Sequence, residues 1–275
     1  MELSSEPAVL TAKAKAGLHG RMLTFLTRGS GAVRVYARRS NRRGARPSFL
    51  EPLQGGELSY IQPPGDAPAR LVAFVPQRVW PGVREDFDRT IQALAFLEVL
   101  NLCTTEGESQ PELFALLVEF LNRIEADARP EAIRALATAR LLVVAGFAPQ
   151  MSACVACRAS IAPGTAVAVD VLAGGAICRT CLPGQAKGTG LPIVSAGAQG
   201  LLSRSLRQHA GAQLWRLRPS RAIAAEGLAL LELFVEASVG ARPRSHEFLA
   251  KIRAGLSTRG GRGRRKSAPP RGATP

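Results

Sequence analysis

Two Cys-x-x-Cys pairs, Cys154-Val155-Ala156-Cys157 and Cys178-Arg179-Thr180-Cys181, are separated by twenty residues. Two thiolates three positions apart on a tight turn can face one tetrahedral metal ion, and two such turns on a hairpin complete a four-sulfur site. The residues between them contain Pro163-Gly164, Gly174-Gly175 and alternating valines, which is typical of a short β-ribbon. The sequence therefore predicts one Zn²⁺ per chain, in a ribbon at about residues 150–185.

A complete shell of four thiolates leaves no coordination position for water, so we expect the zinc to be structural. Two alternatives use the cysteines differently. Disulfide bonds would suit an exported protein, but the count of five cysteines is odd and the start Met1-Glu2-Leu3-Ser4 does not resemble an export signal. A redox Cys-x-x-Cys normally occurs once, between a strand and a helix. The fifth cysteine, Cys103, is expected to pack in the core.

The length allows two domains of moderate size, because 46% of the 275 residues are hydrophobic. No apolar run in the sequence reaches the length of a membrane span. We therefore expect a cytoplasmic protein without a membrane partner.

The net charge of +15 is unevenly distributed. Residues 1–80 carry +7 and residues 242–275 carry +9, whereas residues 81–150 carry −5. Arginine dominates among the cations, and its planar guanidinium suits phosphate better than the ammonium of lysine does. A polyanion is the expected partner, with nucleic acid favoured over a membrane surface, which would place the protein at the nucleoid. A GC-rich genome that enriches arginine at surface positions is the alternative explanation.

Short strands separated by Gly and Pro turns are expected in residues 1–80. Val33 and Val35 alternate with Arg34 and Tyr36, which is the pattern of a half-buried strand. Short strands in a segment of this length favour a small barrel. The expected strands lie at about residues 22–26, 33–36, 57–62 and 71–75.

Five arginines occupy the nine residues from Arg38 to Arg46, and Gly44 and Pro47 block regular structure there. No acidic residue lies between Arg28 and Ser48, so we expect an electropositive loop that contacts phosphates. A solvated loop without a ligand is the alternative. The predicted DNA contacts are Lys13, Lys15, Arg34, Arg38, Arg39, Arg42, Arg43 and Arg46.

The hydrophobic pattern becomes helical from residue 86. A helix over 87–102 is apolar on nearly every side, as expected of a buried element. Pro111 and Pro130 are each expected to begin a further helix. Proline is tolerated at the first helical position because a backbone N–H there would have no acceptor within the helix. Two or three helices are expected after the ribbon, at about 196–210, 220–239 and 245–256, the last with Ser245 as its N-cap. Residues 257–275 are predicted to form a disordered basic tail.

No enzyme and no small-molecule substrate are expected. The sequence contains neither the P-loop pattern nor Gly-x-Gly-x-x-Gly after a strand. The three histidines, His19, His209 and His246, are not spaced with carboxylates in a way that indicates a catalytic metal or a triad.

Over about residues 8–256 the chain resembles the RecO family of bacterial recombination mediators. The stretch from Leu23 to Ala37, followed by a basic loop, is similar to the N-terminal OB-fold of that family, and Phe49-Leu50-Glu51-Pro52-Leu53 is similar to its next strand entry. The segment from Arg140 to Pro149, which leads into Cys154, resembles the family's junction between helix and zinc site. The segment Ser245-His246-Glu247-Phe248-Leu249 resembles the family's C-terminal helix. Part of the family carries the zinc site.

The resemblance implies an α+β fold, with an OB-fold barrel at 1–80 and a helical domain at 81–256 that carries the zinc ribbon. It also implies a non-enzymatic protein that binds single- and double-stranded DNA, anneals strands and works with RecR. The family engages the C-terminal tail of the single-stranded-DNA-binding protein so that recombinase can load. Few aromatic residues stand in the barrel for base stacking, namely Phe25, Tyr36, Phe49 and Tyr60, so binding is expected to be mainly electrostatic.

An acidic tail with a terminal aromatic residue needs an apolar groove with cations at its edge. We expect this groove after the ribbon, where leucines such as Leu201 and Leu214 alternate with arginines. The predicted contacts are Arg204, Arg207, Trp215 and Arg216. The alternative to a groove is that these apolar residues form helical core. The alternative function is that of a ribosome- or RNA-associated zinc-ribbon protein without mediator activity.

Overall fold

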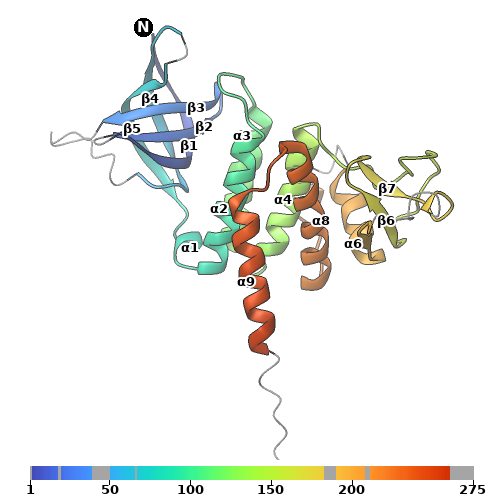
Figure 1. Cartoon of the computed structure of the whole chain (residues 1–275). Helices are drawn as coiled ribbons and strands as arrows, with labels where there is room; N and C mark the ends of the chain where they lie inside the picture. Colours follow the sequence, from blue (N-terminus) through green and yellow to red (C-terminus); the bar gives the residue numbers. More distant parts are fainter. Residues whose placement is uncertain are drawn as a thin grey trace, which may run out of the picture.

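The computed structural model describes residues 2–17, 20–38, 50–65, 67–182, 190–207 and 211–260. An N-terminal β-barrel lies at one end, a group of helices occupies the centre, and a small β-ribbon lies at the other end (Figure 1). This arrangement confirms the predicted α+β class, with a barrel followed by a helical region that carries the cysteine ribbon.

The barrel consists of five strands in the order β1-β2-β3-β5-β4, and β1 pairs with β4 to close it. The bounds are Glu2–Ala16 for β1, Gly20–Thr27 for β2, Gly31–Arg38 for β3, Gln54–Gln62 for β4 and Ala69–Val79 for β5. All pairs are antiparallel except β3 with β5, where Tyr36 lies opposite Arg70. Five strands in this order form the closed, OB-like barrel that the sequence predicted.

The four expected strands correspond to β2 to β5, whereas β1 was not expected. The centre of the barrel is filled by apolar side chains that alternate along each strand, since successive residues of a strand face opposite sides of the sheet. They include Leu10, Leu23, Phe25, Val35 and Leu58.

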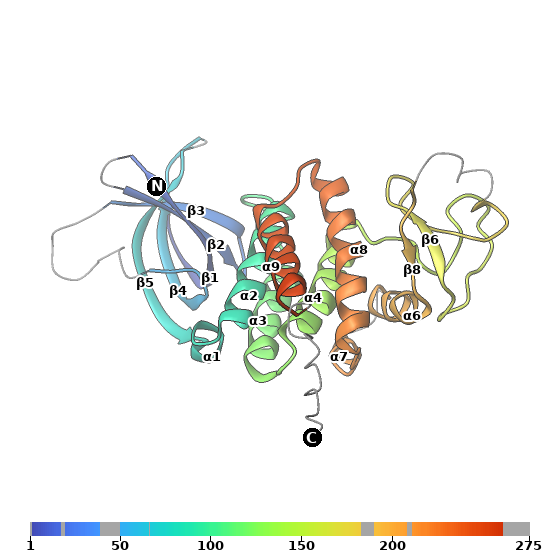
Figure 2. The same ribbon diagram turned by 60° about the horizontal axis from the view of Figure 1, so that its bottom comes forward.

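Helices α3 (Pro111–Ala126) and α4 (Pro130–Val144) begin at the prolines that predicted them, whereas the short α1 (Pro81–Arg84) was not expected. Helix α2 spans Phe87–Leu102. The side chain of Asp86 caps α2 by accepting a hydrogen bond from the backbone N–H of Arg89 at 2.9 Å. Helix α4 contacts α2, α3 and α8 (Arg221–Val239), so it lies at the centre of the bundle (Figure 2).

A buried polar cluster joins three of these helices. The Arg134 side chain on α4 is 1% exposed. Its Nη2 donates to Glu232 of α8 at 2.7 Å, and its Nε donates to Gln92 of α2 at 2.5 Å. A buried guanidinium requires such partners, because an uncompensated charge inside the protein is strongly destabilising.

Helix α9 spans Arg244–Gly260 and packs against α2. Its first backbone N–H groups, of Arg244 and Ser245, donate to the carboxylate of Glu98 on α2 at 3.0 and 2.8 Å. The N-terminus of α9 is therefore held by a side chain from another helix, and Ser245, the expected N-cap, lies inside the helix. None of the helices in the described part of the chain is both long and apolar enough to cross a membrane.

The ribbon consists of β6 (Val167–Asp170), β7 (Gly175–Ile177) and β8 (Ile193–Val194), in the order β7-β6-β8. Helices α6 (Ala196–Ser205) and α7 (Gly211–Leu214) follow it, and the short α7 was not expected. The buried Gln199 side chain of α6 donates to the carbonyl of Met151 at 3.0 Å. Because the apolar residues of the ribbon belong to the same core as the helices, the ribbon is anchored to the helical domain.

Candidate metal centre and nucleic-acid interface

The first Cys-x-x-Cys pair lies on a tight turn. The Cys154 N–H donates to the Ala159 carbonyl at 2.8 Å, and the Arg158 N–H donates to the Cys154 carbonyl at the same distance. Arg158, the residue after Cys157, has a φ of 64°. This left-handed conformation turns the chain back at the position where a glycine would be least strained.

The second pair follows β7 directly. The Cys181 N–H donates to the Cys178 carbonyl at 3.1 Å, which closes the second turn. The two turns are joined, because the Val155 N–H donates to the Ala176 carbonyl at 2.9 Å and the Cys178 N–H donates to the Cys154 sulfur at 3.3 Å. The β-ribbon thus holds the two turns against each other.

The four sulfur atoms of Cys154, Cys157, Cys178 and Cys181 lie within 4.8 Å of one another. The Sγ atoms of Cys157 and Cys178 are 3.7 Å apart. A tetrahedral ion with metal–sulfur bonds of about 2.3 Å requires sulfur–sulfur distances of about 3.8 Å. The cluster is therefore preformed for a metal ion with four sulfur ligands.

The pKa values of the cysteine thiols in the cluster are also consistent with a site that binds a cation. Burial opposes ionisation of Cys154, but hydrogen bonds from the backbone N–H groups of Cys178, Cys157 and Ala156 outweigh it and lower the pKa of its thiol to about 6. Hydrogen bonds with Cys157 and Cys178 raise the pKa of Cys181 to about 12. Thiolates this close repel one another, so the cluster holds four of them only around a positive ion.

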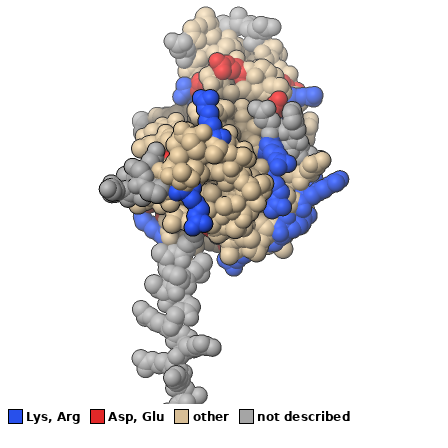
Figure 3. Space-filling model, turned by 90° about the vertical axis from the view of Figure 1, so that its right-hand side faces the viewer, with Lys and Arg blue, Asp and Glu red and all other residues tan. Residues whose placement is uncertain are grey.

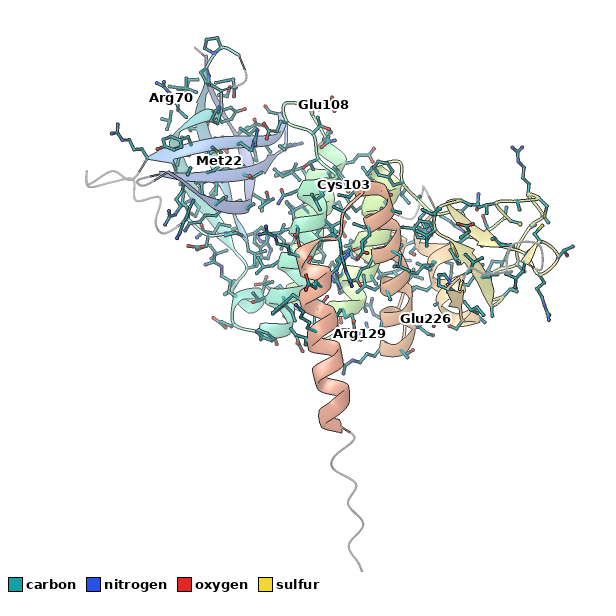
Figure 4. All side chains as sticks on the ribbon, in the orientation of Figure 1. Met22, Arg70, Cys103, Glu108, Arg129 and Glu226 are labelled. Carbon is teal, nitrogen blue, oxygen red and sulfur yellow. The ribbon has the colours of Figure 1, made fainter. Side chains whose placement is uncertain are left out.

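Cys103 is separate from this cluster. It follows the last residue of α2, in the helical part of the molecule, and Figure 4 shows it away from the ribbon. Burial raises the pKa of its thiol, as expected of a cysteine that packs against the core.

The predicted DNA contacts on the barrel differ in their surroundings. Lys13 forms an ion pair with Glu51, and Arg34 forms one with Glu106, which follows α2. Lys15 and Arg38 are exposed. The other four predicted contacts, Arg39, Arg42, Arg43 and Arg46, lie outside the described residues.

Of the four aromatic residues considered for base stacking, Phe49 lies outside the described residues, and the other three offer little stacking surface. Phe25 is buried in the barrel, and Tyr60 is buried with its hydroxyl bonded to Glu6 at 3.0 Å. Tyr36 is partly exposed and lies between Met22 of β2 and Arg70 of β5 across the sheet, two residues that Figure 4 marks on the barrel. Arg70 is an exposed cation that the sequence pattern did not single out.

The apolar side chains expected to line a groove after the ribbon are buried. Trp215 is 3% exposed, and its ring lies 5.8 Å from the guanidinium carbon of Arg123. Leu201 and Leu214 are buried as well, so the apolar residues belong to the core, the alternative that the pattern had left open. Arg204, Arg207 and Arg216 are exposed.

Comparison with known proteins places the chain among DNA repair proteins. The family model described as "Recombination protein O C terminal" matches residues 84–247, which is more than half of the chain. The chain belongs to the RecO family. It is accordingly a DNA repair and recombination protein of a family without enzymatic activity, as the sequence predicted.

Full-length relatives agree with this assignment. The chain is 32% identical to the DNA repair protein RecO of Anaeromyxobacter sp. (strain Fw109-5) over 240 residues, which cover 86% of this chain and 91% of the relative. It is 30% identical to that of Myxococcus xanthus (strain DK1622) over 256 residues, which cover 92% and 99% of the two chains. The likeness to RecO therefore includes the barrel as well as the helical region.

Proposed function

We propose that this RecO chain is a recombination mediator of the RecF pathway. In this proposal it binds single- and double-stranded DNA, anneals complementary strands, and helps to load recombinase onto DNA coated by the single-stranded-DNA-binding protein. The observation that carries the proposal is the combination, in one RecO chain, of an OB-like barrel with a basic segment that continues from β3. Annealing needs no bond chemistry, only cations that offset the repulsion between two phosphate backbones.

The main DNA contact of the barrel is proposed to be the segment Arg38 to Arg46, together with Lys15. Lys15 and Arg38 are exposed. Lys13 and Arg34 are each paired with a carboxylate, so we expect them to release fewer counterions and to contribute less. Binding is then electrostatic and depends little on the base sequence.

The metal of the ribbon is proposed to be Zn²⁺, one per chain, bound by Cys154, Cys157, Cys178 and Cys181. Four sulfur ligands in a tetrahedral arrangement favour zinc over the oxygen-seeking cations. The ion has a structural role, since it holds together two turns that belong to the core of the helical domain.

The proposed protein partners are RecR and the C-terminal tail of the single-stranded-DNA-binding protein. Beside the exposed cations Arg204, Arg207 and Arg216, the described leucines Leu201, Leu202 and Leu214 and the Trp215 ring are buried, which argues against this place for the tail. An open groove of about 790 Å³ lies between the turn after β2 and helix α3. It is lined by the apolar Phe114 and Val118, by Arg28, and by Arg123, which is paired with Glu119 of the same groove at 3.1 Å. Arg28 and the apolar side chains supply the chemistry that an acidic, aromatic-ended tail requires.

Binding of a peptide that copies the acidic tail distinguishes the groove on α3 from the surface around Arg204 and Arg207. Val118→Asp puts a negative charge in the groove on α3, and we expect it to weaken peptide binding, while Arg204→Gln with Arg207→Gln leaves binding unchanged. The opposite pattern assigns the tail to Arg204 and Arg207. If the wild-type protein does not bind the peptide, the proposed partner is wrong.

The alternative, an RNA-associated zinc-ribbon protein, uses the same charges. Binding to a DNA strand and to an RNA strand of the same sequence and length separates the two functions when it is measured at one salt concentration. A mediator binds the DNA strand at least as tightly as the RNA strand. A clear preference for RNA, without annealing of DNA, supports the alternative.

A further inference from the structure

The ribbon end of the molecule is a second basic surface, apart from the barrel. Between residues 151 and 207 the sequence carries five Lys and Arg residues and a single acidic residue, Asp170. Figure 3 faces this end, and Lys and Arg side chains occupy more of it than Asp and Glu do. The helices between the barrel and the ribbon come largely from the acidic segment 81–150. The two basic surfaces are therefore separate.

Two arginines lie at the metal centre itself. Arg158 follows Cys157 and Arg179 follows Cys178, and the sulfur atoms of these two cysteines are 3.7 Å apart. The two arginines are thus carried by adjacent turns, and both are exposed. Among the residues that the structure describes, neither guanidinium forms an ion pair, in contrast to Lys13 and Arg34 on the barrel.

The backbone conformation of Arg158 gives a second, independent reason to assign a function to its side chain. In the described part of the chain, Arg158 and Leu53 are the two non-glycine residues with positive φ. The left-handed conformation costs a residue with a β-carbon about 1 kcal/mol or more relative to glycine. Arg158 is strained at a solvent-exposed turn where glycine would relieve the strain. This indicates that the arginine side chain has a function that glycine could not provide.

We propose that Arg158 and Arg179 bind the phosphate backbone of a second nucleic-acid strand, while the barrel holds the first. The inference rests on the proposed strand annealing and adds to it a site for the second strand. Each guanidinium offers several N–H donors in a planar fork that matches phosphate oxygens. Holding a second flexible strand on the same molecule raises its effective concentration near the first, which speeds the search for complementary segments.

Strand bridging tests this site without requiring annealing. An immobilised single strand of thymidines is loaded with protein, and the retention of a second, labelled thymidine strand is measured. The variant is Arg158→Gly with Arg179→Gln, in which the glycine relieves the backbone strain so that the fold is retained. The control is Arg242→Gln with Lys251→Gln, which removes two positive charges that are already paired with carboxylates.

We expect the ribbon variant to bind the first strand within about threefold of the wild type and to lose about tenfold in retention of the second strand. The control should retain both strands, and sedimentation should give the same oligomeric state for all three proteins. Undiminished bridging by the ribbon variant overturns the second site, as does a wild-type protein that binds and anneals strands but bridges none. A wild-type protein that binds no DNA at all contradicts the proposed function itself.

Discussion

The sulfur atoms of Cys157 and Cys178 lie 3.7 Å apart although twenty residues separate them in the sequence. The ribbon strands bring the two turns together, and the spacing is the one that a single tetrahedral ion would require. The same proximity places Arg158 and Arg179 on neighbouring turns. The cysteine cluster thereby determines where two exposed cations lie.

The zinc site is expected to contribute strongly to stability. The purified protein should contain one equivalent of zinc, and Cys178→Ser should lower the unfolding temperature markedly, because structural zinc contributes on the order of 10 kcal/mol of apparent binding free energy. Metal analysis and thermal unfolding with and without a chelator check this. Cys103→Ser is the matched control and should keep the metal. Less than about half an equivalent of zinc, with disulfide-linked cysteines, would refute the site.

Replacement of Arg158 by glycine should stabilise the protein. Glycine adopts the observed φ of 64° without strain, so the free energy of unfolding should rise by up to about 1 kcal/mol. Arg158→Ala removes the same charge but keeps the β-carbon, and it should give no such gain. Denaturant unfolding of the two variants measures the difference. Equal stability of the glycine and alanine variants would show that the turn is not strained.

The buried ion pair between Arg134 and Glu232 should be sensitive to the loss of its carboxylate. Glu232→Ala weakens the compensation of a guanidinium that is 1% exposed, and we expect a loss of about 3 kcal/mol in the free energy of unfolding. Glu226→Ala, on the same helix, instead removes two exposed hydrogen bonds that Glu226 accepts from Ser195, and should cost less. Equal losses in the two variants would argue against a special role of the buried pair.

The contact between Glu98 and helix α9 should make stability depend on pH. Burial raises the pKa of Glu98, but hydrogen bonds from the backbone N–H groups of Ser245 and Arg244, together with nearby His246, outweigh burial and lower it. A lowered pKa means that the stabilisation is present above the ordinary value of 4.5 and is lost as the pH falls through the folded value. The stability difference between wild type and Glu98→Gln should therefore shrink from pH 7 towards pH 3. A difference that does not change with pH would exclude this linkage.

The arginine segment after β3 should dominate the salt dependence of DNA binding. Replacement of Arg38, Arg39, Arg42 and Arg43 by glutamine should weaken binding to all sequences alike. The slope of log affinity against log salt should decrease by roughly 0.7 to 0.9 for each phosphate that the protein no longer neutralises. Removal of residues 261–275 is the comparison, and it should reduce affinity without unfolding the protein. An unchanged slope in the quadruple variant would assign the main DNA-binding site to another surface.

The helices and the metal centre could be predicted from local patterns. Pro111 and Pro130 begin α3 and α4 as expected, because proline is favoured at the first turn and excluded from the interior. The cysteine spacing was sufficient for the four-sulfur cluster, since the ligand types and the turn geometry are both local.

The remaining features depend on residues that are distant in the sequence. Strand β1 is rich in alanine and contains Pro7, and it becomes a strand by pairing with β2 and β4 on its two edges. The partner of Arg34 is Glu106, from a segment that follows α2, and no pattern near Arg34 indicates it. Trp215 carries the same local pattern whether it lines a groove or packs in the core, and tertiary packing decides in favour of the core.

The central claim is that this RecO chain anneals DNA in the presence of the single-stranded-DNA-binding protein. The most direct measurement is the rate of annealing of complementary strands coated with that protein, compared with strands coated by a form that lacks the acidic C-terminal tail. The account predicts rapid annealing of the strands coated with the intact protein and much slower annealing when the tail is missing. Annealing of bare strands alone, with none on strands coated with the intact protein, would contradict it.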